Sequence, residues 1–459
     1  MQATTLDQLN LDALSALLRG RIVTPTETDY HEIRKVYNGM IDKRPLLIVQ
    51  CVDVADVLAA VDFGRHNGIP VAVRGGGHNG GGLGVCDDGM VIDLSGIKFV
   101  RVDTDNRTVR VGGGNLWGEV DHALHAFGLA VPAGIISSTG VGGLTLGGGV
   151  GHLSRKYGLT IDNLLEADMV LADSSFVTVN EHSHPDLFWA IRGGGGNFGI
   201  VTAFQFRAHP LKTVIGGPML WPIERTEEIM AWYDGFLHEQ PDDLNGFVAT
   251  MMIPGPPFPE ELHLKPFCGI VWCYTGEQDG FDKLIAPARA LDPVFEHVGE
   301  MPYPAVQTMF DGMMPHGMQW YWRGDFFDRI TPEAAARHRD FGSRIPTPLS
   351  QMHLYPISGA AGRVDPEAMA WAYRDAKYAG VVVGVDPAPE NAGKITDWCK
   401  DYHQALHPSS LGGAYSNFMM NEGAERVRAS YRHNYERLVE IKRKYDPENL
   451  FCINQNIAP

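Results

Sequence analysis

The sequence predicts an α+β fold of two lobes, and three features of the chain lead to this prediction. Glycine gathers in clusters within residues 71–82, 139–159 and 192–206, among short strand-like runs. From about 213 to 410 glycine becomes sparse, and aromatic strand-like runs alternate with helix-like segments. The end of the chain then returns to the first pattern. We therefore predict one lobe over 1–212, a second over 213–410, and a segment 411–459 that packs back onto the first.

The first lobe is expected to start with a strand, a helix and a second strand. The short apolar run "LLIVQC" (46–51) is typical of a buried strand. The next segment places apolar residues at helical spacing, with Asp53 as a candidate N-cap and Gly68 as a stop. The run "IPVAVRG" (69–75) is the second strand, so the first glycine cluster directly follows a strand.

This first cluster, "GGGHNGGG" (75–82), contains the G-x-G-x-x-G pattern at Gly75, Gly77 and Gly80. In a Rossmann fold the pattern opens a helix, because the helix N-terminus holds the pyrophosphate. Here residues 89–97 predict a strand instead, and 99–114 predict a hairpin around Asp105–Asn106. An NAD-dependent dehydrogenase is therefore not expected, although backbone N–H groups of the loop can still hold a nucleotide.

The other two clusters also point to a ligand that approaches the main chain. Residues 139–159 combine glycine with small or aliphatic side chains, so a flat ligand can lie against the backbone there. The third cluster, "RGGGGNFGIVTAFQF" (192–206), follows the helix-like "PDLFWAIR" and enters a strand. Three glycine loops that meet in one cleft would suit a long, bent cofactor with a diphosphate in its middle.

The second lobe is predicted to be an antiparallel sheet covered by helices. Its strand-like runs are "GFVATMMI", "FCGIVWCYTG", "QWYWRGDFF", "SQMHLYPISG" and "GVVVGVD". Helix-like segments such as "TEEIMAWYDGFLHEQ" separate them. The chain ends with an amphipathic helix, a proline-containing turn and a polar tail.

Composition restricts the classes of function. The chain has 459 residues, 44% hydrophobic and 20% charged, and its formal charge of −17 argues against nucleic acid and anionic membranes as partners. Its cysteines form no C-x-x-C pair, so we expect no metal site and no disulfide framework. We see no leader and no run apolar enough to span a bilayer, which predicts a cytoplasmic enzyme, either monomer or homodimer.

Four long motifs resemble those of a known family. "RGGGHN…GG…VIDLS" resembles the covalent-flavin loop of the vanillyl-alcohol-oxidase superfamily, whose FAD-binding domain is called PCMH-type. "PAGIISSTGVGGLTLGGGVGHLSRKYGLTIDNL", "DLFWAIRGGGGNFGIVTAF" and "YDPENLFCINQNIAP" resemble its berberine-bridge-enzyme-like branch, to which 6-hydroxynicotine oxidase belongs. The motifs follow the order of the family and span nearly the whole chain, although residues 213–410 are less similar.

The resemblance implies a PCMH-type FAD-binding domain over 1–212, with its core at about 42–212 and completed by segment 411–459. It also implies that the lobe 213–410 binds substrate and that its sheet roofs the flavin ring. His78 matches the histidine that bonds to the 8α-methyl carbon of the flavin, and Ile136 stands where many relatives carry a second attaching cysteine. We therefore expect covalent FAD with a single linkage, through His78.

The other expected FAD contacts are the positions that match the family motifs. Most are glycines, whose backbone can approach a cofactor closely. Besides His78, the expected set is Arg74, Gly75, Gly76, Gly77, Asn79, Gly80, Gly134, Ser138, Thr139, Gly140, Gly142, Gly143, Gly148, Gly149, Gly151, Tyr157, Gly199, Ile200, Val201, Tyr415, Asn417, Asn454 and Gln455.

Two residues are candidates for the group that accepts the substrate proton. By resemblance Tyr415 faces the flavin, and Asn417 orients it from the same face of an extended segment. In "SQMHLYPISG" Gln351, His353 and Tyr355 share one face of a strand, and His353 stands near the position where relatives carry a carboxylate base. A free tyrosine has a pKa near 10, whereas histidine titrates near neutrality, so His353 needs less adjustment. The sequence leaves both open.

The expected function is an FAD oxidase that dehydrogenates a small or medium organic molecule at a C–H bond next to oxygen or nitrogen, with dioxygen as electron acceptor. The resemblance implies that Thr139 lies beside the reactive edge of the flavin, where its hydroxyl would influence oxygen access; the alternative is that it only caps a turn. The alternative is a flavin oxygenase of polyketide-like substrates in secondary metabolism. A flavin-binding protein without turnover is a third possibility, against which the complete set of loops and Tyr415 argue. Aromatic and Met residues of the second lobe are consistent with an aromatic or apolar ligand: Met251, Trp272, Trp320 and Tyr321.

Overall fold

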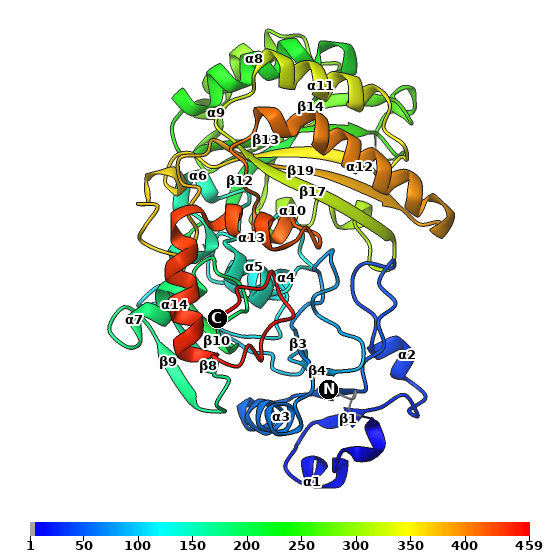
Figure 1. Cartoon of the computed structure of the whole chain (residues 1–459). Helices are drawn as coiled ribbons and strands as arrows, with labels where there is room; N and C mark the ends of the chain where they lie inside the picture. The colour runs from blue at the N-terminus through cyan, green and yellow to red at the C-terminus, as the bar shows by residue number, and fades with distance from the viewer. Residues whose placement is uncertain (1–4, 257) are drawn as a thin grey trace.

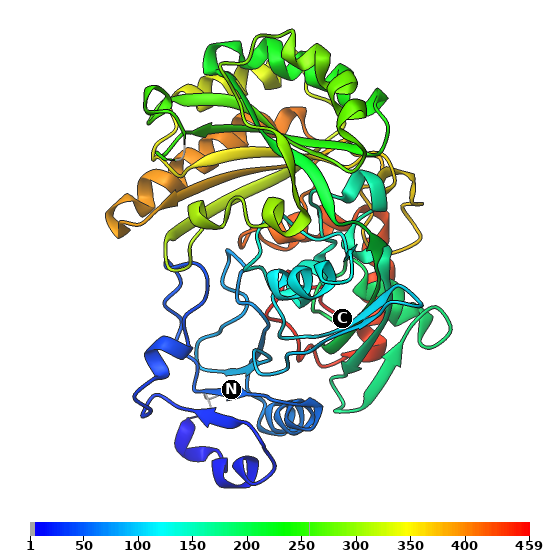
Figure 2. The ribbon, with the colours of Figure 1, turned by 180° about the vertical axis from the view of Figure 1, so that it is seen from behind.

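The computed structural model describes residues 5–256 and 258–459 and has two lobes. Figure 1 shows an upper lobe, which has a large sheet under a layer of helices, and a lower lobe, which contains two smaller sheets. The view from behind in Figure 2 shows the same separation. Helix and sheet are both abundant and lie largely in separate layers, so the predicted α+β class is confirmed.

The first small sheet contains the predicted strand–helix–strand unit. Its order is β1-β2-β4-β3, with β2, β4 and β3 parallel and β1 antiparallel to β2. Helix α3 starts at the predicted cap, because the Asp53 side chain accepts hydrogen bonds from two backbone N–H groups, and it stops at Gly68, which has φ of 59°. The bounds are β1 (Arg21–Val23), β2 (Leu47–Gln50), α3 (Val54–Asn67), β3 (Val71–Arg74) and β4 (Met90–Asp93), with the short helices α1 (Leu11–Ser15) and α2 (Tyr30–Ile33) before them.

The second small sheet is antiparallel and carries the predicted hairpin. Its order is β5-β6-β10-β8-β9, and the β5–β6 turn is closed by Asp103, which accepts hydrogen bonds from the backbone N–H groups of Asp105 and Asn106. As predicted, the chain after the first glycine cluster enters a strand and not a helix. The strands are β5 (Val100–Asp103), β6 (Thr108–Gly112), β8 (Leu164–Val170), β9 (Phe176–Val179) and β10 (Ile200–Arg207), and β7 (Leu129–Ala130) pairs with β11 (His209–Pro210) outside it.

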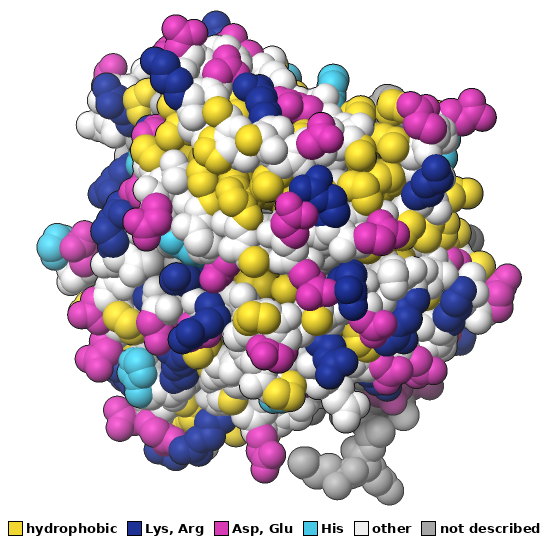
Figure 3. Space-filling view, turned by 90° about the horizontal axis from the view of Figure 1, so that it is seen from above, with side chains coloured by type: hydrophobic (Ala, Val, Ile, Leu, Met, Phe, Trp, Pro, Cys, Tyr) yellow, Lys and Arg dark blue, Asp and Glu magenta, His cyan; other side chains and the backbone are white. Residues whose placement is uncertain are grey.

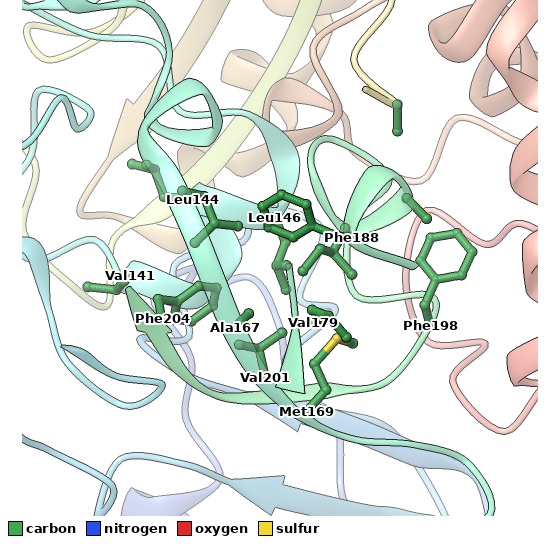
Figure 4. Packing of buried hydrophobic residues seen from close by; sticks show 14 of the residues in the cluster. Val141, Leu144, Leu146, Ala167, Met169, Val179, Phe188, Phe198, Val201 and Phe204 are labelled. Carbon is green, nitrogen blue, oxygen red and sulfur yellow. The ribbon is translucent and has the colours of Figure 1, made fainter. Parts of the chain in front are cut away.

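The second glycine cluster forms a short helix that sequence reasoning did not predict, α5 (Val141–Gly147). Its apolar residues Val141 and Leu144 are buried in the core of the lower lobe, together with Phe204 of β10 (Figure 4). Gly143 faces the other way into open space, since nothing lies within 4 Å of a Cβ built there. The helix therefore turns a bare glycine surface away from the core. The neighbouring helices are α4 (Trp117–His125), α6 (Ser154–Tyr157) and α7 (Pro185–Ile191).

The large sheet has eight strands, all antiparallel to their neighbours, as predicted for the second lobe. Its order is β15-β12-β14-β13-β18-β19-β17, and β16 also pairs with β12. The strands are β12 (Thr213–Pro222), β13 (Leu244–Met252), β14 (Pro266–Tyr274), β15 (Phe295–Glu296), β16 (Gly299–Pro302), β17 (Gln319–Phe327), β18 (Gln351–Pro356) and β19 (Tyr378–Asp386). The helices on its outer face are α8 (Thr226–Phe236), α9 (Gln278–Arg289), α11 (Pro332–Ser343) and α12 (Ala392–Leu406), as Figure 1 shows, and α10 (Tyr303–Gln307) lies near α4.

Side chains alternate between the two faces of this sheet. On β18, Met352 and Leu354 pack into the core under the outer helices, whereas Tyr355 belongs to the cluster that faces the lower lobe. On β19, Val382 joins the outer core while Val381 faces the lower lobe. The same period of two therefore decides which side chains roof the space between the lobes.

Buried arginines fix the sheet above the lower lobe. Arg155 of α6 donates hydrogen bonds to the backbone oxygens of Leu237 and Leu244, which flank the start of β13. Arg374 donates two hydrogen bonds, at 2.6 and 2.9 Å, to the carboxylate of Asp162 in the lower lobe. Both guanidinium groups are almost fully buried and hydrogen-bonded, so these contacts hold the sheet to the lower lobe.

The C-terminal segment lies against the lower lobe. It forms α13 (Ala424–Tyr431), α14 (Tyr435–Tyr445) and a tail, and Figures 1 and 2 show α14 and α7 in the same region. The ammonium of Lys442 is buried and donates to the backbone oxygen of Asn197 at 2.7 Å and to Asp446 at 2.6 Å. This contact brings the tail to the third glycine cluster.

The outer surface of the upper lobe carries acidic, basic and hydrophobic side chains intermixed (Figure 3). Within the described residues, no helix combines the length and apolar character that crossing a bilayer requires.

Candidate functional site

A cavity of about 310 Å³ lies between the lobes. A second cavity measures only about 10 Å³, so the first is the candidate site for an organic ligand. Glycines of all three clusters line it from below, among them Gly76, Gly140 and Gly196, and side chains of the large sheet line it from above. The structure thus brings together the three loops that the sequence predicted to converge.

His78 lies in the loop after β3, at the wall of this cavity. The ring of Tyr37 stacks on its imidazole with centroids 3.8 Å apart and planes 20° apart. The Nε2 atom of His78 is buried and has no hydrogen-bond partner. Burial, assisted by the nearby His316, lowers the pKa of His78 to about 3. The imidazole is therefore neutral near pH 7 and keeps a free lone pair, as a nucleophile requires.

Arg74 lines the cavity at the end of β3 and is paired with Asp93 at the end of β4. The Nη2–Oδ2 distance is 2.8 Å, and the two side chains are 7% and 3% exposed. Since β3 and β4 are parallel and adjacent, the pair bridges the ends of two neighbouring strands. The charge of the guanidinium is thus neutralised by a fixed partner within the protein.

The first and second glycine loops touch through their backbones. A Cβ on Gly140 would lie 2.4 Å from the backbone nitrogen of Gly76, and a Cβ on Gly76 would lie 2.6 Å from that of Gly140. Any side chain at either position would push the loops apart. This contact sets the position of the His78 loop relative to α5.

Tyr415 is buried, and its hydroxyl oxygen receives two hydrogen bonds. The donors are the backbone N–H of Gly149, at 2.8 Å, and Nδ2 of Asn417, at 2.7 Å. Burial nevertheless raises the pKa of Tyr415 to about 12. The predicted extended segment is wrong here: residues Ser416–Phe418 form a 3-10 turn, and this turn brings Asn417 back to the phenol.

The residues Gln351, His353 and Tyr355 of β18 are buried and hydrogen-bonded in series. His353 contacts the hydroxyl of Tyr355 through Nδ1, at 2.5 Å, and Oε1 of Gln351 through Nε2, at 2.8 Å. Burial lowers the pKa of His353 to about 3 and raises the pKa of Tyr355 above its usual value. Both side chains are therefore neutral, and His353 and Tyr355 line the cavity.

Most of the residues expected from the sequence lie in the cavity wall. The lining includes Thr139 and His353 and, of the expected FAD contacts, Arg74, Gly75, Gly76, Gly77, His78, Asn79, Gly134, Gly140, Gly142, Gly143, Gly199, Ile200, Val201, Tyr415, Asn417, Asn454 and Gln455. The side-chain amides of the last two residues donate to the backbone oxygens of Gly196 and Met420, which holds the tail at the cavity.

The structure places the other expected residues outside this lining: Gly80, Ser138, Gly148, Gly149, Gly151 and Tyr157. Gly148 and Gly149 instead make room for packing, because a Cβ on Gly148 would lie 3.0 Å from the Trp371 ring. Tyr157 stacks on His209, with centroids 3.9 Å apart. Gly80 lies under Trp322, whose ring would be 2.2 Å from a Cβ.

Several lining residues were not identified from the sequence as site residues. Tyr37 belongs to a loop far from any motif, and no pattern in the sequence links it to His78. The sequence could have identified Trp322, because side chains alternate along "QWYW" and Trp322 therefore shares a face with Trp320. Of the four aromatic and Met residues that were consistent with an apolar ligand, only Trp320 lines the cavity; the others pack elsewhere: Met251, Trp272 and Tyr321.

Among the described residues, one group of three side chains has the spacing of metal ligands: Asp325, His403 and His407. It lies outside the cavity lining. One carboxylate oxygen of Asp325 is engaged by the guanidinium of Arg426 and the other contacts both histidines, at 3.1 and 3.0 Å. An ion-pair network therefore accounts for this group without a metal.

The chain matches two family models. The model described as "FAD binding domain" matches residues 45–180, and the model described as "Berberine and berberine like" matches residues 414–458. The two matched segments contain His78 and Tyr415, respectively.

Full-length relatives carry related names. The chain is 33% identical over 452 residues to the uncharacterized FAD-linked oxidoreductase YgaK of Bacillus subtilis, covering 96% of this chain and 97% of the relative. It is 29% identical over 458 residues to (R)-6-hydroxynicotine oxidase of Paenarthrobacter nicotinovorans, covering 96% and 97%. The crystal structure of 6-hydroxy-D-nicotine oxidase from Arthrobacter nicotinovorans superposes with a TM-score of 0.86 at 26% identity, covering 96% of this chain and 98% of that one.

Proposed function

Because the chain belongs to the berberine-bridge-enzyme-like family of FAD-linked oxidoreductases, we propose that it is an oxidase with FAD attached covalently through His78. It removes hydrogen from a neutral, largely apolar organic molecule at a C–H bond next to oxygen or nitrogen, and passes the electrons to dioxygen. The observation that supports this most is the neutral His78 imidazole, with an unpartnered buried nitrogen, at the edge of a glycine-lined cavity.

The cavity residues fit FAD. Backbone N–H groups of the loops around Gly76, Gly140 and Gly196 can donate to a diphosphate, and the absence of Cβ atoms lets the main chain approach it. His78 supplies the nucleophilic nitrogen for a bond to the flavin. The cavity wall has Ile136 where many relatives have cysteine, so this position offers no second attachment.

FAD, when bound, supplies the capacity to take two electrons from the substrate and to return them to dioxygen. The chain supplies position and hydrogen bonds. The roof of the cavity is formed by Trp320, Trp322 and Val383 of the large sheet, which keep water away and pack against an apolar ligand. The two N–H donors on Tyr415 leave its own proton as the group that it can offer to a substrate oxygen or nitrogen.

The charge of the wall supports a neutral substrate. Among the described lining residues, Arg74 is the one side chain of the Lys, Arg, Asp and Glu types, and its charge is neutralised by Asp93. The described lining residues of the large sheet include no Lys, Arg, Asp or Glu, so a charged substrate beneath them would lose its hydration without gaining a counter-charge. The diphosphate instead lies against the backbone N–H groups of the glycine loops. We therefore propose an aromatic or apolar alcohol or amine as the substrate class.

The cofactor and its linkage can be tested together. The purified protein is precipitated with acid and the pellet is examined for flavin absorbance. We expect the colour to stay with the protein, to be lost from it in His78→Ala, and to stay in His316→Ala, since His316 lies 6.2 Å from His78 and outside the lining. A colourless wild-type protein would refute the proposal.

The electron acceptor requires a second measurement. Candidate alcohols and amines are screened for release of hydrogen peroxide, and products are analysed after reaction under labelled dioxygen. An oxidase yields one peroxide for each product and no label in the product. Label in the product would instead support the oxygenase alternative.

A further inference from the structure

The direction of the hydrogen bonds on β18 follows from Gln351. Its Nε2 donates to the backbone oxygen of Leu349 at 3.3 Å, so its Oε1 is the atom that faces His353. An amide oxygen only accepts, and Nε2 of His353 must therefore carry the proton. The tautomer is then fixed: Nδ1 of His353 is an acceptor, and the hydroxyl of Tyr355 donates to it.

This arrangement decides which atom can receive a proton from the cavity. Both ring nitrogens of His353 are occupied, one by Tyr355 and one by Gln351, so a ligand has no direct access to either. The oxygen of Tyr355 still has free acceptor capacity, because its own proton points away from the ligand toward His353. Tyr355 lines the cavity, and Gln351 does not.

The surroundings of the pair are apolar. The rings of Phe247 and Phe310 lie 5.0 and 6.4 Å from the His353 ring, and Phe247 also lies 5.0 Å from Tyr355. Burial alone accounts for the lowered pKa of His353, with no charged group contributing. In such a site a proton moves along a hydrogen bond that already exists, without reorganising water.

The hydrogen bonds of Tyr415 run in the opposite direction to those of Tyr355. Its oxygen receives N–H groups from Gly149 and Asn417, and neither can take a proton. Its own proton has no acceptor among these two contacts and Tyr415 lines the cavity, so it is arranged to donate a hydrogen bond there. The Phe418 ring lies 4.8 Å from the Tyr415 ring and 5.7 Å from the Tyr355 ring, so both phenols contact the same phenyl group.

We propose that Tyr355 is the group that takes the hydroxyl or amine proton of the substrate, that it passes its own proton to Nδ1 of His353, and that Gln351 is a positioning residue for this transfer. The proposal rests on the oxidase function proposed above. It assigns the donor role to Tyr415 and makes His353 the final proton acceptor, reached only through Tyr355.

In this transfer each bond that breaks is matched by one that forms. The substrate O–H or N–H bond breaks and a new O–H bond forms on Tyr355, while the original O–H bond of Tyr355 breaks and an N–H bond forms at Nδ1 of His353. FAD, when bound, would accept the neighbouring C–H hydrogen with its electron pair, so that the substrate carbon gains a double bond to oxygen or nitrogen. His353 ends as imidazolium, a form that burial disfavours, so it must release this proton again before the next turnover.

The first test reads the tautomer and does not depend on turnover. In the holoenzyme labelled with ¹⁵N-histidine, the His353 signals are identified by their loss in His353→Gln. We expect a protonated Nε2 and an unprotonated Nδ1 that accepts a hydrogen bond, and the Nδ1 signal shifts in Tyr355→Phe. In Gln351→Leu the preference for this tautomer weakens, whereas Gln351→Glu preserves it. A proton on Nδ1 in the wild-type protein would overturn the proposal.

The second test compares rates. We expect Tyr355→Phe to slow substrate-dependent flavin reduction by about 10²- to 10³-fold, the usual contribution of a positioned acid or base, with flavin content unchanged. His353→Gln should slow it as well and move its pH dependence to higher pH, because Tyr355 must then ionise without an acceptor.

The chain contains a matched control in a second buried His–Tyr pair. Nδ1 of His338 and the hydroxyl of Tyr402 are 2.6 Å apart, and Tyr402 lies outside the cavity lining. Tyr402→Phe should leave the rate within about twofold of wild type. If Tyr355→Phe behaves like this control, the relay is refuted while the oxidase stands. If the wild type carries no flavin and releases no peroxide, the oxidase function itself is refuted.

Discussion

Gly143 offers the sharpest test of where the cofactor lies, because one methyl group there should have opposite effects on stability and on flavin binding. Gly143 is the third residue of α5, and a Cβ at this position meets nothing within 4 Å. It is exposed, and its exposed surface belongs to the cavity wall. Replacement of a helical glycine by alanine stabilises a helix by about 0.5–1 kcal/mol. For a protein of this size that corresponds to a rise in Tm of about 1–3 °C.

The same methyl group projects into the space assigned to FAD. Overpacking of one carbon in a tight site costs about 1–3 kcal/mol, which is about 5- to 150-fold in affinity. We therefore expect Gly143→Ala to purify with less flavin than wild type. The matched control is Gly235→Ala in α8, which also has open space for a Cβ and is exposed on the far side of the molecule. It should gain a similar stability and keep its flavin.

Three measurements decide the outcome: the ratio of flavin to protein absorbance, the rate of flavin reduction, and Tm in the flavin-free His78→Ala background. In that background, loss of cofactor cannot obscure the effect on the helix. A full flavin content and normal reduction rate in Gly143→Ala would show that the cofactor does not lie against α5. A fall in Tm in the flavin-free background would show instead that the space at Gly143 is needed by the fold.

Three other predictions concern polar side chains. Asp93→Ala leaves Arg74 buried and unpaired and should destabilise the protein by about 3–5 kcal/mol in urea unfolding; a loss below about 1 kcal/mol would contradict the geometry. Burial raises the pKa of Asp121 to about 7, so this carboxyl costs stability as pH rises from about 4 through 7. Asp121→Asn should therefore raise Tm at pH 8 and leave it unchanged at pH 4, and an equal effect at both pH values would exclude titration as the cause. Thr139→Val should change the rate at which dioxygen reoxidises the flavin without altering flavin content, and an unchanged rate would remove Thr139 from the reaction.

Local signals allowed parts of the fold to be predicted closely. Asp53 and Gly68 fix the two ends of α3 through contacts with their own helix, so the sequence contains all the information needed. The β5–β6 hairpin is similar, because Asp103 closes its turn by bonding to residues two and three positions on. Such interactions do not depend on the rest of the molecule.

Tertiary packing explains what was missed. The run "VGGLTLG" has poor helix propensity, yet it forms α5 because Val141 and Leu144 are buried in the lower core. The turn at Ser416–Phe418 replaces the predicted extended segment for a similar reason: Asn417 bonds both to the Tyr415 hydroxyl and to the backbone oxygen of Leu144. Leu144 is far in sequence from the turn, and the core residues that bury α5, such as Phe204, are far from α5.

The face that β18 presents to the cavity is determined by the hydrophobic core on its other side. Met352 and Leu354 must be buried under the outer helices, and because side chains alternate along a strand, His353 and Tyr355 must then face the lower lobe. A shift of one residue in the pairing with β19 would exchange the two sets. It would bury the polar groups among apolar helices and expose the apolar ones to the cavity. The energy that orients the proposed proton relay is therefore the burial of its apolar neighbours. The alternating residue pattern predicted that Gln351, His353 and Tyr355 share one face, but not the relay itself.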